Sequence, residues 1–156
     1  MDDVLLEVKQ LKVQFETGKG TDAKNRDTVV DDISFCINRG EILGLVGESG
    51  SGKSMTGLTI LGLLKKGGKV TSGAIYFEGK DILRMTEDEK YSLRGNEIAM
   101  IFQEPMTSLN PVMKIGDQVD EMIMLHNKIS KELCNEKTLA ALEEAGFDQV
   151  ETVYRS

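Results

Sequence analysis

The sequence predicts an α/β fold in three successive parts, and the change in apolar pattern along the chain is the reason. In residues 1–40 apolar and polar residues alternate, which is typical of strands in an antiparallel layer. Residues 41–110 contain two short apolar runs and, between them, a glycine-rich loop followed by a helical pattern, which is typical of a core with buried strands. Residues 111–156 show helical patterns only. We therefore expect residues 1–156 to form one domain with a β layer, a core and the start of a helical part.

Strands are expected wherever the alternation is sustained. Residues 4–15, VLLEVKQLKVQF, predict a strand or a pair of strands, and residues 28–38, TVVDDISFCIN, predict another. The polar, glycine-containing residues 16–27 between them indicate a loop. A further strand is expected at Val70–Phe77.

The core and the helical end show other patterns. The runs EILGLV at 41–46 and EIAMIF at 97–102 predict strands buried on both faces. Leucine spacing predicts a helix over 53–64, and two more helices are expected near 115–127 and 131–145.

Two helix starts carry capping residues. Thr86 followed by Glu89 forms a capping-box pattern before a short helix that ends near Arg94. Ser130 is the expected N-cap of the last helix.

Composition excludes several classes of function. The formal net charge of −7 argues against a broad nucleic-acid surface, which needs clustered lysines and arginines. No segment approaches the ~18 consecutive apolar residues of a membrane span, and the acidic start at Met1–Asp3 is unlike a secretory signal. We expect a cytoplasmic chain in which Cys36 and Cys134 are buried thiols.

The glycine-rich loop GESGSGKS matches the phosphate-binding pattern G-x-x-x-x-G-K-[ST] at every fixed position. Glycines let successive backbone N–H groups point at phosphate oxygens, and the helix that follows adds its N-terminal partial charge. The pattern predicts that Lys53 reaches the β- and γ-phosphates and that the Ser54 hydroxyl binds Mg²⁺. The expected nucleotide-binding residues of this loop are Gly47, Glu48, Ser49, Gly50, Ser51, Gly52, Lys53 and Ser54.

The fold class is therefore α/β with a P-loop NTPase core, an N-terminal antiparallel β layer and the start of a helical subdomain. The alternative is a glycine-rich turn that binds no ligand. A P-loop alone does not name a function, because GTPases, kinases, helicases and transporters all use one.

Three segments carry a resemblance to the ATPases of ABC transporters, and within them to the branch that serves oligopeptide, dipeptide and nickel importers. They are VGESGSGKS at 46–54, SGAIYFEGKD at 72–81 and IFQEPMTSLNP at 101–111. The resemblance covers essentially the whole chain, and the third segment is the most specific to this branch.

The resemblance implies roles for single residues. Gln103 matches the Q-loop glutamine, which in the family contacts Mg²⁺ or its water. Phe15 lies where the family places an aromatic residue that stacks on adenine, although the pattern fits a core strand residue equally well. Glu104 does not match the family's catalytic glutamate, and His126 does not match its switch histidine; we expect His126 to be a partly exposed helical residue.

The resemblance also implies partners and cofactors. The expected cofactors are ATP and Mg²⁺, and the expected partners are transmembrane permease subunits, a second ATPase subunit and, indirectly, a solute-binding protein. The helices after Pro111 match the subdomain that docks onto the permease, at the inner face of the membrane. Met122–Met124 could form a pliable contact surface there, but helical spacing favours a place in the core. No partner nucleic acid is expected.

The sequence lacks three parts of the family pattern: the signature motif, the Walker B strand with the catalytic glutamate, and the switch histidine. No catalytic residue is expected within residues 1–156. We expect the chain to be the N-terminal part of an importer ATPase that couples ATP binding and hydrolysis to transport, and to be inactive alone. The alternatives are a nucleotide-binding regulatory module without hydrolysis and a soluble ABC ATPase. The transported solute does not follow from the sequence.

Overall fold

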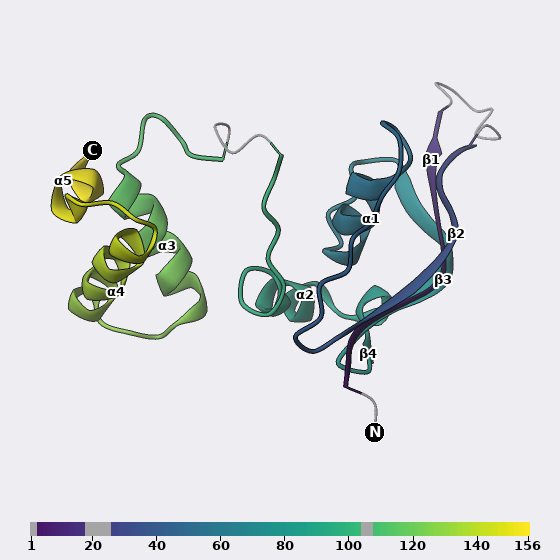
Figure 1. Cartoon of the computed structure of the whole chain (residues 1–156), viewed down its shortest axis with the longest axis horizontal. Coiled ribbons are helices and arrows are strands. Elements are labelled where there is room, and N and C mark those ends of the chain that lie inside the picture. Colours follow the sequence, from purple (N-terminus) through teal and green to yellow (C-terminus); the bar gives the residue numbers. More distant parts are fainter. Residues whose placement is uncertain (1–2, 18–25, 104–107) are drawn as a thin grey trace. The chain divides into compact units, whose positions relative to one another are not determined.

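The computed structural model describes residues 3–17, 26–103 and 108–156 (Figure 1). The described residues up to Arg94 form one compact unit, and residues Gly95–Ser156 form a second. Glu104 lies outside the described residues. The predicted division at 40/41 and 110/111 remains a prediction.

The first unit is built on one antiparallel sheet with the strand order β2-β1-β3-β4. Its strands are β1 (Val4–Glu16), β2 (Arg26–Asn38), β3 (Gly68–Phe77) and the two-residue β4 (Lys80–Asp81). The three long strands confirm the alternating segments, and the first segment forms a single strand rather than a pair. Since β1 lies between β2 and β3, its buried residues form the centre of this unit's core.

Both β1 and β2 contain a bulge that shifts the apolar alternation by one residue. Gln10 adopts a left-handed φ of 46° and interrupts the register of β1 between Val8 and Leu11, which are both buried. Asp32, with a φ of 49°, lies at the neighbouring register shift, between Ile33 and Val30 of β2. Bulges bend strands and increase their twist, and Figure 1 shows the sheet curving around α1.

Helix α1 (Lys53–Ile60) follows the glycine-rich loop and packs on the inner side of this curved sheet. Gly52 sits at its N-cap with a φ of 90°, directly against β2, where an added Cβ would overlap the Val29 carbonyl oxygen. The Thr59 and Ile60 side chains are buried. The contact between Gly52 and β2 therefore fixes the position of Lys53, the first residue of the helix.

The helix ends four residues before the predicted Leu64. Gly62 adopts a φ of 65° and its N–H donates to the Thr59 carbonyl, while the Leu63 N–H donates to the Leu58 carbonyl at 2.8 Å. These two bonds form a Schellman motif, in which a left-handed glycine ends a helix. The prediction was too long because the leucine spacing continues past this glycine.

A 3₁₀ turn, η1 (Ile82–Arg84), and helix α2 (Glu87–Leu93) complete the first unit. The capping box is confirmed: the Thr86 hydroxyl accepts from the Glu89 N–H, and the Glu89 carboxylate accepts from the Thr86 N–H at 2.8 Å. The turn η1 was not predicted, because three residues are too few to form a periodic pattern.

The second unit consists of α3 (Ile115–His126), α4 (Lys131–Glu144) and α5 (Val150–Arg155). The first two confirm the predicted helices, and the Ser130 hydroxyl caps α4 by accepting from the Leu133 N–H. Helix α5 was not predicted, because six residues are too few for a periodic pattern.

A buried carboxylate links the three helices. Asp120 of α3 accepts hydrogen bonds from the Thr138 hydroxyl of α4 and, at 2.7 Å, from the Tyr154 hydroxyl of α5. This hydrogen bond to Asp120 raises the pKa of Tyr154. The Tyr154 ring lies on Gly116, where a Cβ would overlap it. Burial raises the pKa of the Cys134 thiol, which lies beside the Asp120 backbone.

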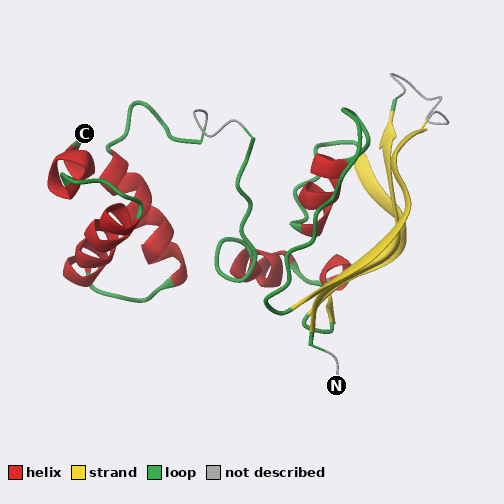
Figure 2. Cartoon of the chain, viewed as in Figure 1, coloured by secondary structure: helices red, strands yellow, loops and turns green. Residues whose placement is uncertain are grey.

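The predicted strands at 41–46 and 97–102 are wrong as elements of this structure (Figure 2). A strand needs hydrogen-bonded neighbours, and within the described residues neither run lies in a sheet. All side chains of the first run are exposed, Ile42 by 97%, and in the second run Ile101 is 95% exposed while Ile98 and Met100 are half-buried. Apolar composition predicted strands, but it could not supply their neighbours.

Three further expectations about burial are corrected or confirmed. Met122 and Met124 are exposed, so they do not lie in the core as the helical spacing favoured. Cys134 is buried as predicted, but Cys36 is exposed, because it lies on the outward side of β2. His126 is half-buried at the end of α3, as expected.

The exposed apolar run at 41–46 predicts self-association of the chain, because extended apolar segments without strand partners pair with other chains. We expect wild type to scatter light as oligomers and Ile42→Lys to shift the distribution toward monomer. The matched control is Val112→Lys, which adds the same charge at an equally open site, 88% exposed, outside the run. Monomeric wild-type protein, or an equal effect of both variants, would contradict this prediction.

The contact of Gly52 with β2 predicts a large difference between two glycine substitutions. Gly50 and Gly52 both have left-handed φ values, 84° and 90°, but an added Cβ meets nothing within 4 Å at Gly50. Gly50→Ala should cost about 1–2 kcal/mol of backbone strain. Gly52→Ala should cost clearly more, because α1 must also move off β2. Thermal unfolding of both variants measures the difference, and equal losses would show that the contact with Val29 is unimportant.

Candidate functional site

The loop Gly47–Ser54 forms a tight curl in front of α1. The Ser51 N–H donates to the Glu48 carbonyl at 3.2 Å, and the positive φ values of Gly50 and Gly52 turn the chain. A Cβ on Gly47 would come within 2.5 Å of the Ser51 hydroxyl. Glycine is thus required at Gly52, where the loop meets the backbone of β2, and at Gly47 it avoids a close approach to the Ser51 side chain.

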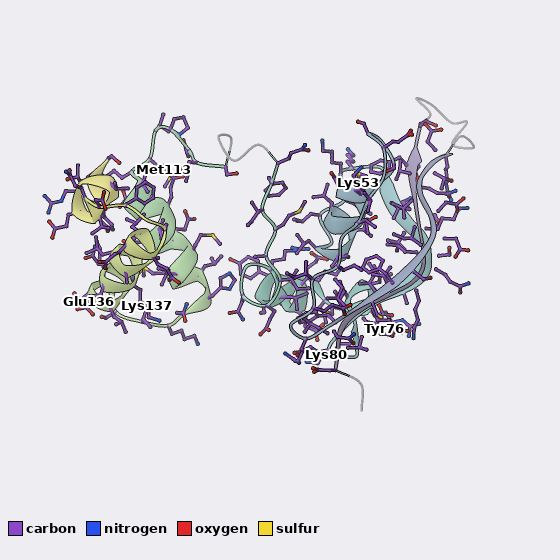
Figure 3. The ribbon with its side chains drawn as sticks, viewed as in Figure 1. Lys53, Tyr76, Lys80, Met113, Glu136 and Lys137 are labelled. Carbon is purple, nitrogen blue, oxygen red and sulfur yellow. The ribbon has the colours of Figure 1, made fainter. Side chains whose placement is uncertain are left out.

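Lys53 closes this curl with its own side chain. Its ammonium donates to the Gly47 carbonyl at 2.7 Å, to the Glu48 carbonyl at 2.8 Å and to the Ser51 hydroxyl at 3.3 Å. The three protons of an ammonium group are therefore directed at oxygens of the loop. Figure 3 labels Lys53 at the start of α1. The positive charge lies at the loop, where an anion would be held.

The first turn of α1 adds backbone donors to the same place. The Thr56 N–H donates to the Gly52 carbonyl at 2.8 Å, so the amides of residues 53–55 precede the first intrahelical bond and have no intrahelical acceptor. Ser54 is exposed in this turn. No acidic residue stands in the first turn of α1, so the partial positive charge of the helix end is not offset there.

The Ser54 hydroxyl is suited to serve as one ligand of a metal that arrives with a phosphate. Within residues 3–17, 26–103 and 108–156, no three histidine, cysteine or acidic side chains gather as a metal site. The Ser54 hydroxyl offers a single oxygen at the loop. Mg²⁺ characteristically combines one or two protein oxygens with phosphate oxygens and water, and one hydroxyl beside a phosphate-binding loop suits that arrangement.

A cavity of about 470 Å³ lies between the loop and β2. Among its lining residues Lys53 and Asp31 are charged, and Asp31 is already paired with Lys12 at 2.8 Å. The β2 wall, including Thr28, was not predicted as part of the site. No local signal identifies it, because strand pairing and the packing of Gly52 bring β2 to the loop.

A second hollow of about 500 Å³ on the sheet has a different character. Its cations are paired with carboxylates: Lys9 with Glu7 at 2.9 Å, and Arg39 with Glu78. Lys9 also lies 5.3 Å from the centre of the Tyr76 ring. Since these charges are compensated, this hollow lacks the open donors of the P-loop.

The two predicted site residues outside the loop lie in different units. Phe15 belongs to β1, and its ring lies over Gly68 of β3, where an added Cβ would come within 2.6 Å of it. It is half-buried, and its neighbour in β2 is Asp27, next to Thr28 of the cavity. Gln103 is exposed and belongs to the second unit. The contributions of Phe15 and Gln103 to a nucleotide site stay predictions.

Curated relatives resemble the chain over nearly all of its length. The oligopeptide transport ATP-binding protein AppD of Bacillus subtilis is 43% identical over 152 residues, which cover 97% of this chain and 45% of the relative. The oligopeptide transport ATP-binding protein OppD of Escherichia coli is 45% identical, covering 90% and 40%. The dipeptide transport ATP-binding protein DppD of Lactococcus lactis is 42% identical, covering 96% and 42%. The chain thus spans less than half the length of these relatives.

Solved structures show the same fold. A bacterial ABC transporter cassette, solved as a dimer, matches with a TM-score of 0.78 at 22% identity, covering 97% of this chain and 60% of that one. The cbiO1 protein of Clostridium perfringens, part of the ABC transporter complex cbiONQ, matches with a TM-score of 0.66, also at 22% identity, covering 96% and 53%. These matches confirm the predicted α/β fold class of a P-loop NTPase.

No helix within the described parts of the chain is long and apolar enough to cross a membrane. The model of the ABC transporter family matches residues 30–154, most of the chain and all of the P-loop. With this match and the relatives above, the chain belongs to the ABC transporter family.

Proposed function

We propose that this chain binds the triphosphate of ATP at Gly47–Ser54 and supplies that site to the ATP-binding subunit of a peptide importer. The observation that carries the proposal is the position of the Lys53 ammonium, within 2.8 Å of two loop carbonyls and at the start of α1. A loop of this geometry offers a positive charge and backbone N–H groups to phosphate oxygens.

Each residue of the site would make a different contact with Mg-ATP. The Lys53 ammonium contacts the β- and γ-phosphates, and the backbone N–H groups of the first turn of α1 donate hydrogen bonds to the remaining phosphate oxygens. The Ser54 hydroxyl would hold the Mg²⁺ that accompanies ATP, and the resemblance of Gln103 to the Q-loop glutamine of the family supports it as a second Mg²⁺ ligand. Phe15 stacks on adenine beside the Thr28 end of β2. The metal neutralises phosphate charge when it is bound.

The transport role rests on the relatives, whose names describe oligopeptide and dipeptide transport ATP-binding proteins. The proposed partners are transmembrane permease subunits, a second ATPase subunit and, indirectly, a solute-binding protein. The whole protein would then work at the inner face of the cell membrane and convert ATP hydrolysis into import of peptides or related small solutes. No nucleic-acid partner is proposed.

A second candidate is a regulatory module that binds nucleotide without hydrolysing it. Its support is the same phosphate-binding loop, Gly47–Ser54, which would serve nucleotide binding with or without hydrolysis.

Removal of the Lys53 charge tests the binding site. In isothermal titration with Mg-ATP, Lys53→Ala should weaken binding by roughly tenfold or more, since a charge-assisted hydrogen bond contributes about 1.5–3 kcal/mol. Lys66→Ala removes the same charge from an exposed position outside the loop and should leave the affinity unchanged. Equal affinities of Lys53→Ala and wild type would show that the loop is not the site.

Turnover separates binding from catalysis. We expect the 156-residue chain to release no phosphate from Mg-ATP above the background of the Lys53→Ala variant, because no residue matches the general base of the family. A phosphate-release assay at saturating Mg-ATP measures this. Turnover that Lys53→Ala abolishes would mean that the chain contains a catalytic group that we have not identified.

A further inference from the structure

The C-terminal end of α1 is hydrogen-bonded by Arg94, the residue that directly follows helix α2. The Arg94 Nε donates to the Leu61 carbonyl at 2.7 Å, and one of its terminal nitrogens donates to the Gly62 carbonyl at 3.3 Å. These carbonyls lie at the C-terminal end of α1, where the Schellman bonds do not reach them. Arg94 directly follows α2, and its own N–H donates to the Lys90 carbonyl at 3.0 Å.

Helix α1 has few capping interactions of its own. It has eight residues, no side-chain N-cap and no basic residue in its own last turn. Isolated helices of this length are marginal in water, and a cation near the C-terminal carbonyls stabilises a helix through its dipole. Arg94, distant in sequence, supplies that cation, while Gly52 fixes the opposite end on β2.

We propose that Arg94 is a positioning residue for the phosphate-binding loop, and this rests on the proposed function of that loop. By fixing the last turn of the two-turn helix α1, Arg94 keeps the amides of the first turn and the Lys53 ammonium in place for phosphate. It touches no ligand itself. Preorganised donors bind without an ordering cost, so loss of Arg94 weakens phosphate binding at a distance.

The test measures affinities of the 156-residue chain for Mg-ATP and for tripolyphosphate by isothermal titration. We expect R94A to weaken both ligands by the same factor, about five- to tenfold, because the lost capping contact acts on the phosphate end of α1. R94K keeps a cation but not the planar fork and should restore part of the affinity. R94Q keeps the first three side-chain carbons and a polar end but removes the charge, and it replaces R94A if the alanine variant does not fold.

Two further measurements separate positioning from general destabilisation. The matched control is R84A, which removes the same charge from a side chain that is 88% exposed and paired with Asp81; its affinity should equal that of wild type. Amide hydrogen exchange should speed up in α1 of R94A or R94Q while β1 and β3 stay protected.

Each outcome decides the proposal. The order wild type, R94K, then R94A or R94Q, with faster exchange confined to α1, supports it. Wild-type affinity in any folded variant without the Arg94 charge overturns it, and so does a loss in R94K as large as in R94A. Wild-type protein that binds neither ligand overturns the proposed function together with this inference.

Discussion

The packing of α1 against the sheet is the constraint on which the geometry of the glycine-rich loop depends. The Cβ-free surface of Gly52 lets the helix start directly against the Val29 carbonyl of β2. That contact fixes the point from which Lys53 turns back to the loop and from which the first helical amides emerge. A loop of this kind is thus formed by its sequence and by the strand behind it, and a glycine position in the motif reflects packing as much as backbone freedom.

Sequence reasoning succeeded where the structure is local and failed where it depends on distant neighbours. Capping at Thr86 and Ser130 was predicted because a few adjacent residues determine it. Strand alternation located β1 and β2, but the bulges at Gln10 and Asp32, which shift that alternation, need the paired strand to define them. The same reason explains the wrong strands: the runs at 41–46 and 97–102 have strand composition, and composition cannot provide a hydrogen-bonded neighbour.

The candidate site shows the same boundary between local and distant information. The eight residues Gly47–Ser54 are contiguous, so the spacing of the motif was enough to identify them as one candidate site. Thr28 and Arg94 reach the loop or its helix through the sheet and through α2, and no pattern near either residue marks it. In the second unit, the buried Asp120 was equally invisible, since its meaning comes from hydroxyl groups on two other helices. A polar residue in a helical pattern is ordinarily read as exposed.

The contacts of Lys53 also indicate with which groups a phosphate would compete at this loop. The Lys53 ammonium already donates hydrogen bonds to two loop carbonyls, at 2.7 and 2.8 Å. A phosphate must therefore compete with neutral carbonyls, and it gains because hydrogen bonds to a charged acceptor are roughly twice as strong as those to a neutral one. The carbonyls that lysine leaves lie in an exposed loop, where water replaces it at small cost. Under the proposed function, the net gain would depend on whether the helix amides are already in place, so the affinity would depend on the rigidity of α1 as well as on the lysine.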